Sequence, residues 1–226
     1  MNTKETQEAA FVDAQHRLVA ELPDSFFYLR HGKTTDNQAE IISGGERDHE
    51  SILLPESIEE ASRLGATIEN MREYIALICH SPMIRARDTA RYINATANIP
   101  MIEIQKLHEW KVGNCSGRKN QEFSGPLSNW EYDPDGGESR TVFATRVAEG
   151  MEECCRSLNP YRARTADKPR SMLVVAHAGV WWALRELLGL ERDQIHNCVP
   201  IQVERVPNQT NNKDGLPRWQ HRALSL

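Results

Sequence analysis

Apolar and polar residues alternate along this chain with two different periods, which separate predicted strands from predicted helices. Short, nearly continuous apolar runs bounded by polar residues are typical of strands buried on both faces of a sheet. Near the end of the chain, two segments alternate apolar and polar residues around a polar turn, as in a hairpin. The predicted strands lie at 25–30, 75–79, 100–104, 171–176, 200–206 and 219–224.

Apolar residues that recur every three or four positions predict helices between most of these strands. Pro55 suits the first turn of one helix, because proline is favoured at that position. Residues 32–54 and 105–137 show no clear period, and the second segment is rich in glycine and proline, so both are expected to be loop-rich. The predicted helices lie at 1–22, 55–71, 83–96, 139–158 and 179–188.

Strands that alternate with helices predict the α/β fold class with a largely parallel sheet. No internal repeat, low-complexity block or convincing linker divides the chain. We therefore expect a single domain over residues 23–226, preceded by a helical extension over residues 1–22 that covers a hydrophobic surface. The 226 residues are enough for a core that needs no disulfide or metal to hold it together.

Charge and composition exclude several classes of protein. The net charge of -5 gives no basic excess for binding nucleic acid. No apolar run approaches the roughly 20 residues that cross a bilayer, so no membrane partner is expected. Lys4, Glu5 and Glu8 stand where a secretory signal would be apolar. The 5 cysteines include no CxxC pair, which favours reduced thiols and a cytoplasmic location.

Basic and histidine side chains follow the ends of three predicted strands. Arg30 and His31 follow the first strand, His80 follows the second, with Arg85 shortly afterwards, and His177 follows the most apolar strand. Ligands of open α/β sheets bind outside the carboxyl ends of the strands. If these strands are neighbours, their histidines and arginines meet at one edge of the sheet.

This set of side chains is suited to a phosphate group. Arginine offers planar, bidentate donors to phosphate oxygens, and helices that begin at the same edge favour an anion. The sequence has no GxSxG elbow and no phosphate-binding GxxxxGK[ST] loop, and Cys79 lies in an apolar run that disfavours its thiolate. A neutral histidine can itself attack phosphorus, and the arginines supply the positive charge that a metal would otherwise provide.

Five segments in the expected order carry a resemblance to a known family. Arg30-His31-Gly32-Lys33-Thr34 with Asn37 is similar to the pattern RHGxTxxN, and residues 81–90 (SPMIRARDTA) are similar to SPLxRAxxTA. Leu107-His108-Glu109 with Gly113 and Gly117 matches LxExxxGxxxG. Residues 135–139 (DGGES) resemble PGGES with Asp in place of Pro, and residues 174–180 (VVAHAGV) resemble VSHGGV. From about residue 25 to 206 the chain resembles the histidine phosphatase superfamily. That family includes the cofactor-dependent phosphoglycerate mutases. The resemblance implies a three-layer αβα sandwich around a mostly parallel sheet.

The resemblance also implies roles for individual residues. His31 would be the nucleophile that forms a phosphohistidine, and Glu109 would protonate the leaving oxygen and then help to activate water. Arg30, Arg85 and His177 would bind the oxygens of the phosphoryl group and take part in catalysis. Further phosphate contacts are implied for Asn37 and Ser43. No cofactor and no metal are expected.

Alternatives to these roles remain open in the sequence. Glu131, Glu138 or Asp36 could replace Glu109 as the proton donor. Of the adjacent pair Trp181 and Trp182, the helical period places at least one in the core.

The expected activity is that of a metal-independent histidine acid phosphatase-type hydrolase acting on a small phosphomonoester. One alternative is a phosphoglycerate-type mutase, although residues 118–132 lack the long insert and paired arginines of such enzymes. A second is a non-catalytic module that binds phosphorylated ligands. A third is a metalloenzyme, disfavoured because two arginines beside the ligands would repel a divalent cation.

Departures from the family pattern concern the substrate more than the architecture. Lys33 stands where glutamate is usual in the family, and Ala178 replaces the first glycine of HGG. Residues 44–57 do not follow the family's usual pattern of an aromatic residue and then LTxxGxxQA. Specificity is expected to come from residues 38–57, 110–135 and 181–185. Neither the substrate nor the oligomeric state follows from the sequence.

Overall fold

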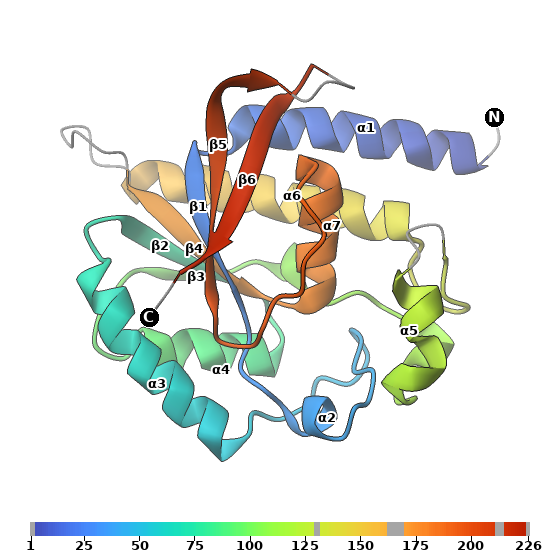
Figure 1. The fold of residues 1–226 in the computed structure, drawn as a ribbon, viewed down its shortest axis with the longest axis horizontal. Coiled ribbons are helices and arrows are strands. Elements are labelled where there is room, and N and C mark those ends of the chain that lie inside the picture. Colours follow the sequence, from blue (N-terminus) through green and yellow to red (C-terminus); the bar gives the residue numbers. More distant parts are fainter. Residues whose placement is uncertain (1–2, 129–131, 162–169, 211–214, 225–226) are drawn as a thin grey trace.

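A six-stranded sheet forms the centre of the protein, whose computed structural model describes residues 3–128, 132–161, 170–210 and 215–224. The strand order is β3-β2-β4-β1-β5-β6 (Figure 1). Strands β3, β2, β4 and β1 are parallel, whereas β5 and β6 are antiparallel to their neighbours, which gives the predicted mostly parallel sheet. The strands are β1 (Ser25–Arg30), β2 (Ile75–His80), β3 (Met101–Glu103), β4 (Ser171–Ala176), β5 (Pro200–Thr210) and β6 (Pro217–Ala223).

Helices cover both faces of the sheet, because the central strands are apolar on both sides. Every residue of β2 and β4 is buried. Along β1, Phe26 and Tyr28 pack into the core on the side of α1, α6 and α7, while Phe27 and Leu29 pack on the side of α3 and α4 (Figure 1). The three-layer αβα sandwich is therefore confirmed. Its helices are α1 (Thr3–Glu21), α3 (Pro55–Asn70), α4 (Ile84–Ile93), α6 (Arg140–Leu158) and α7 (Ala178–Leu188).

The first helix is part of the main core. Ala14 and Leu18 of α1 are fully buried and share a hydrophobic cluster with Phe143 and Val147 of α6. The predicted helix over residues 1–22 and its role as a cover are thus correct, while the domain boundary after residue 22 stays a prediction. None of the helices in the described ranges combines the length and the apolar character that a membrane crossing requires.

The segments expected to be loops contain short helices. Helix α2 (Thr35–Gln38) forms inside 32–54 because Thr34 and Asn37 cap it reciprocally, a local interaction that hydrophobic periodicity does not report. Inside 105–137 lies α5 (Asn120–Ser128), whose glycine and proline hide its weak apolar period. Single 3-10 turns lie at Gln105–Leu107, Gly113–Cys115 and Asn159–Tyr161.

Candidate active site

The strand order brings the predicted catalytic residues to one edge of the sheet. Strand β4 pairs with β1 on one side and with β2 on the other, so the residues that follow all three strands are neighbours. The backbone N–H of His31 donates to the carbonyl of Ala176, 3.0 Å away, just before His177. The ring centroids of His31 and His177 are 5.2 Å apart. The expected meeting of these strand ends is confirmed.

The imidazole of His31 is buried and oriented by two contacts. Its Nδ1 lies 2.7 Å from the carbonyl oxygen of Gly32, which can only accept a hydrogen bond, so Nδ1 carries the proton. Its Nε2 then keeps the lone pair and accepts from Nε of Arg85 at 3.3 Å. Burial, followed by the charges of Arg85 and Arg30, holds the pKa of His31 well below its usual value. At neutral pH His31 is a neutral base with a defined reactive nitrogen.

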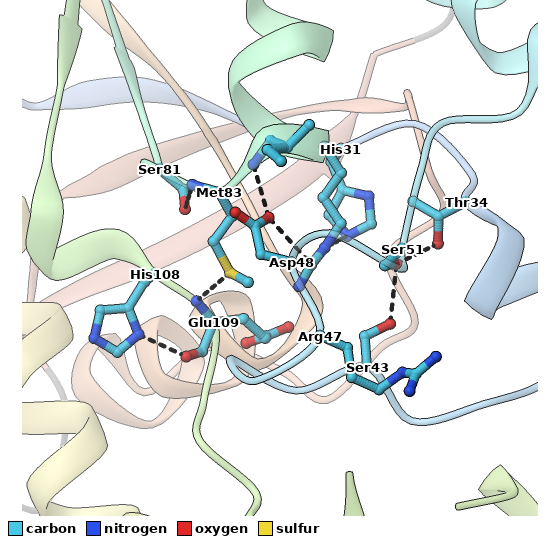
Figure 2. A network of polar contacts seen from close by, with 12 residues as sticks. His31, Thr34, Ser43, Arg47, Asp48, Ser51, Ser81, Met83, His108 and Glu109 are labelled. Atoms are coloured by element: carbon cyan, nitrogen blue, oxygen red, sulfur yellow. Dashed lines mark hydrogen bonds and ion pairs between the residues drawn. The ribbon is translucent and has the colours of Figure 1, made fainter. Parts of the chain in front are cut away.

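Arg85 lies on the first turn of α4 and is almost fully buried, with 1% of its surface exposed. Besides His31, its guanidinium donates through Nη2 to the carbonyl of Gly44 at 3.1 Å and lies 3.8 Å from Asp48. The Asp48 carboxylate also accepts the backbone N–H of Ile84 at 2.8 Å, so it holds the start of α4 as well (Figure 2). Arg85 is thereby fixed beside the reactive nitrogen.

His177 is completely buried and leaves one ring nitrogen unused. Its Nε2 lies 2.7 Å from Oγ of Ser81, and its backbone carbonyl accepts the hydroxyl of Tyr28 at 2.6 Å. Its Nδ1 has no hydrogen-bond partner among the described residues. Burial, and then the charge of Arg85, lowers the pKa of His177 strongly. A neutral imidazole thus lies beside His31 with one buried ring nitrogen that has no partner among the described residues, although His177 itself is not among the residues that line the cavity described below.

Glu109 lies on the loop after β3, lines the same cavity as His31 and is held by backbone groups (Figure 2). Its carboxylate accepts the N–H of Trp110 at 2.8 Å and the N–H of Gly179, at the start of α7, at 3.1 Å. Burial raises the pKa of Glu109, and these N–H groups together with Arg85 and Arg30 oppose the shift. The result is a carboxyl group that keeps its proton to higher pH than an exposed glutamate.

The structure discriminates among the alternative proton donors. Glu138 forms an ion pair with Arg146 at 2.6 Å, and Asp36 forms one with Arg47 at 3.0 Å. Neither carboxylate lines the cavity described below, whereas Glu109 does. Glu131 lies outside the described residues. Glu109 is the carboxylate that the geometry favours.

The remaining predicted phosphate contacts line the same cavity, less tightly fixed. Arg30 donates to the carbonyl of Ile195 at 3.2 Å. The Oδ1 atom of Asn37 caps α2 at the backbone of Thr34. The hydroxyl of Ser43 lies 3.1 Å from that of Ser51, and the Ser51 hydroxyl in turn donates a hydrogen bond to that of Thr34 (Figure 2).

Asn197 is a contact that the sequence prediction missed. Its amide donates to the backbone carbonyl of His31 at 2.7 Å and lies 3.5 Å from Oδ1 of Asn37. It follows no strand and belongs to no quoted motif, so only the packing of 189–199 over the strand ends reveals it. The hydrogen bond from Asn197 fixes the backbone that carries the His31 side chain.

A cavity of about 780 Å³ opens above these residues. Each of the three segments expected to set specificity contributes residues to its walls. Of the two adjacent tryptophans, Trp182 lines the cavity and Trp181 is fully buried in the core. The expectation missed Arg140 and the residues 192–196, which also line it. Its walls include Arg30, His31, Asn37, Ser43, Arg85, Glu109, Trp110, Asn120, Arg140, Gly179, Trp182, Arg185, Glu186, Arg192, Asp193 and Ile195.

Thiol chemistry finds no support in this cavity. All the cysteines are buried and form no disulfide. Cys198, behind Gly32, has its pKa raised to about 12 by burial, so its thiolate is not populated at neutral pH. Within the described residues, no three His, Cys, Asp or Glu side chains group in a way that could hold a metal ion. The thiols therefore offer no candidate nucleophile, and His31 stays the predicted one.

Comparison with known proteins agrees with this arrangement. The family model described as the histidine phosphatase superfamily (branch 1) matches residues 26–205. The solved structure of a mycobacterial glucosyl-3-phosphoglycerate phosphatase in complex with VO3 is 24% identical, with a TM-score of 0.70 over 90% of this chain and 99% of that one. The alpha-ribazole phosphatase from Shigella flexneri is 20% identical, with a TM-score of 0.64 over 88% and 95% of the two chains.

A longer protein is also similar to this chain. The agropine synthesis reductase of Rhizobium rhizogenes is 26% identical over 177 residues, which are 76% of this chain and 36% of that protein. This chain therefore matches little more than a third of that relative's length. The strand-end histidines, the buried arginines and the family match over most of the chain lead to one conclusion: the chain belongs to the histidine phosphatase superfamily, branch 1.

Proposed function

We propose that this protein is a phosphatase that hydrolyses a small phosphomonoester through a phosphohistidine on His31, without a metal ion. The observation that carries the proposal is the fixed tautomer of His31. Its Nδ1 proton is committed to the carbonyl of Gly32, and its Nε2 lone pair faces the Arg85 guanidinium at 3.3 Å. A phosphoryl group bound by Arg85 would lie next to that lone pair.

In the first step, Nε2 of His31 attacks phosphorus and the bond to the ester oxygen breaks. The leaving oxygen takes the proton of Glu109, so the alcohol departs neutral and Glu109 becomes a carboxylate. Burial raises the pKa of Glu109, which supports its protonated form in the resting site. The ring of His31 meanwhile gains a phosphorus–nitrogen bond and carries a positive charge stabilised by the hydrogen bond from Nδ1 to Gly32.

In the second step, a water molecule attacks the phosphohistidine. The Glu109 carboxylate accepts the proton of that water, the phosphorus–nitrogen bond breaks, and His31 recovers its lone pair as inorganic phosphate leaves. Both steps pass through a transition state with charge on three equatorial oxygens. Arg85 and Arg30, which line the cavity, would stabilise that charge. The Nδ1 of His177, which has no partner among the described residues, would donate to one oxygen while its Nε2 accepts the hydroxyl of Ser81.

The test measures phosphate release from 4-nitrophenyl phosphate and from a panel of sugar, carboxylic acid and nucleotide phosphates. The wild type is compared with His31→Ala in the presence of EDTA. His16→Ala is the matched control, because His16 is exposed on α1. We expect metal-independent turnover that disappears in His31→Ala alone, and competitive inhibition by vanadate, which binds as an analogue of the pentavalent transition state.

A labelling experiment tests the covalent step. Rapid acid-free quenching of the wild type with ³²P-labelled substrate should trap an acid-labile, alkali-stable label that His31→Ala lacks. Turnover or label that persists in His31→Ala would contradict the mechanism. The absence of both across the whole panel would contradict the phosphatase and favour a binding module, whereas transfer of label to an added alcohol in place of water would favour a mutase.

A further inference from the structure

The loop that carries Glu109 is held by an arginine of α6. Arg146, in the second turn of that helix, donates through Nη1 to the backbone carbonyls of Lys106 at 2.8 Å and of His108 at 2.9 Å. Its Nη2 donates to the backbone carbonyl of Glu109 at 3.5 Å. Arginine can serve several acceptors at once because its planar guanidinium carries five N–H donors. One side chain therefore binds the backbone of the loop up to Glu109.

The carboxylate of Glu138 fixes the orientation of that guanidinium. Its two oxygens accept from Nε of Arg146 at 2.8 Å and from Nη2 at 2.6 Å, and a bidentate pair of this kind sets the plane of the guanidinium. Burial alone would raise the pKa of Glu138, but the hydrogen bonds and charge of Arg146 hold that pKa below its ordinary value. The pair is therefore ionised at neutral pH. We call Arg146 and Glu138 the loop clamp.

The loop clamp also fixes the residues that follow Glu109. The carboxylate of Glu138 accepts the backbone N–H of Lys111 at 3.1 Å, and the backbone N–H of Glu138 donates to the carbonyl of Lys111 at 2.9 Å. The backbone carbonyl of Glu138 accepts the indole N–H of Trp110 at 2.9 Å. Glu109 is thus held through its neighbours on both sides in the sequence.

The clamp acts from outside the cavity. Among the residues described, Glu109 lines the cavity, whereas neither Arg146 nor Glu138 does. The clamp can therefore influence a bound substrate only through the loop that it holds. The position of this loop matters because a carboxyl group transfers its proton efficiently only within hydrogen-bond reach of the leaving oxygen.

We propose that Arg146, oriented by Glu138, is a positioning residue that holds the Glu109 carboxyl group where it can protonate the leaving oxygen. The inference rests on the proposed function, which makes Glu109 the proton donor. It accounts for a guanidinium with only 15% of its side chain exposed that directs its donors to the backbone around Glu109.

The test measures kcat/KM for phosphate monoesters whose leaving alcohols differ in acidity, from 4-nitrophenyl phosphate to simple alkyl phosphates. This parameter reports the steps up to phosphoryl transfer to His31. We expect Arg146→Gln to lower it by at least about 30-fold for the alkyl esters and by less than about threefold for the aryl ester. The reason is that a misplaced proton donor matters only where the leaving oxygen needs a proton, whereas a merely structural defect would lower all esters alike.

A conservative variant and a matched control accompany Arg146→Gln. Arg146→Lys keeps the charge, so it provides the test even if Arg146→Gln does not fold. Its single ammonium cannot reproduce the planar set of donors, and we expect the same pattern with a loss of about three- to tenfold on alkyl esters. Glu149→Gln is the control, because Glu149 joins the same helix to the same loop through an exposed ion pair with Lys106 at 2.8 Å. We expect it to match the wild type within about twofold for every ester.

Hydrogen exchange of two amides reports the position of the carboxylate without any turnover. The backbone N–H groups of Trp110 and Gly179 donate to the Glu109 carboxylate at 2.8 and 3.1 Å. In Arg146→Lys we expect both amides to exchange at least about tenfold faster, while the amides of β4 keep their wild-type rates. A general loss of stability would accelerate the exchange of all of them.

The two measurements separate this inference from the proposed function. Where esters are hydrolysed, their pattern decides: wild-type values in the folded Arg146 variants, or an equal loss for all esters, would overturn the positioning role and leave the phosphatase intact. If the wild type hydrolyses no ester, the proposed function fails and the amides decide. Faster exchange at Trp110 and Gly179 in Arg146→Lys would then support the loop clamp, and unchanged exchange would overturn it.

Discussion

Replacing Gly179 by alanine should displace Glu109 without disturbing the fold. The N–H of Gly179 donates to the Glu109 carboxylate, and a Cβ at this position would overlap the other carboxylate oxygen and contact Cβ of Trp110 at 3.3 Å. Gly179 lies within α7 and is not among the residues with positive φ, so its backbone suits alanine. Alanine is favoured over glycine inside a helix by about 1 kcal/mol. The perturbation therefore falls mainly on the Glu109 carboxylate, the proposed proton donor.

The size of the effect follows from the overlap. To restore an ordinary contact with the new Cβ, the Glu109 carboxylate must move by about 1 Å, a misplacement that commonly costs about 100-fold in rate. This factor corresponds to about 2.7 kcal/mol of transition-state stabilisation. The loss should apply to esters whose leaving alkoxide needs a proton, and much less to 4-nitrophenyl phosphate, whose leaving group departs as a stable anion.

The assay compares kcat for an alkyl phosphate and for 4-nitrophenyl phosphate in the wild type and in Gly179→Ala. Gly125→Ala on α5 is the control, because a Cβ at Gly125 would meet no described atom within 4 Å. We expect a large fall for the alkyl ester, a small one for the aryl ester, and an unchanged or higher Tm. An equal loss for both esters at normal Tm would refute the assignment of Glu109 as proton donor.

Three further predictions concern the same site. Ser81→Ala removes the hydroxyl that lies 2.7 Å from Nε2 of His177, so a buried nitrogen loses its partner. We expect urea unfolding to show a destabilisation of about 1–3 kcal/mol, and an unchanged unfolding midpoint would contradict this prediction. Asp48→Asn keeps an acceptor for the backbone N–H of Ile84 but removes the negative charge that lies 3.8 Å from Arg85. Because that charge competes with phosphate for Arg85, inhibition by phosphate should become about two- to fivefold tighter. Weaker inhibition would contradict this prediction. Burial and the nearby arginines hold the pKa values of His31 and His177 below their unfolded value of about 6.5, so the unfolded chain binds more protons. The free energy of unfolding should therefore fall as pH drops from about 7.5 to 5, although the raised pKa of Glu109 offsets part of the loss. An increase in the free energy of unfolding over this range would contradict the prediction.

The part of the site around His31 could be predicted from the sequence because its residues follow the ends of strands. Hydrogen bonds between neighbouring parallel strands bring the residues that follow them to the same edge of the sheet, so the apolar runs before His31, His80 and His177 predict a meeting of these side chains if the strands are neighbours. One condition had to come from the structure, namely that β4 lies between β1 and β2. Periodicity identifies a strand, but it does not give the order of strands in the sheet.

Two loops that cross the strand ends, before α3 and before β5, show where sequence reasoning fails. Asp48 and Asn197 position Arg85 and His31, yet neither belongs to a periodic segment or a motif. Each makes a hydrogen bond to a backbone group far away in the sequence, and Asp48 adds an ion pair with Arg85. Such contacts depend on the path of a loop across the sheet edge, and that path is set by packing that no local pattern encodes.

The pair Trp181 and Trp182 shows the same limit within a helix. Successive helical residues point about 100° apart, so one of two adjacent tryptophans can pack in the core while the other faces a cavity. Trp181 packs against Tyr28, with ring centroids 5.1 Å apart, and Trp182 lies beside Arg140. The sequence predicted the first placement. The second required the start of α6 to lie across from α7, because only then does the guanidinium of Arg140 come between indoles from distant segments. For this reason the candidate nucleophile could be named from the sequence, whereas the contact between Trp182 and Arg140 on the cavity wall emerged from the tertiary structure.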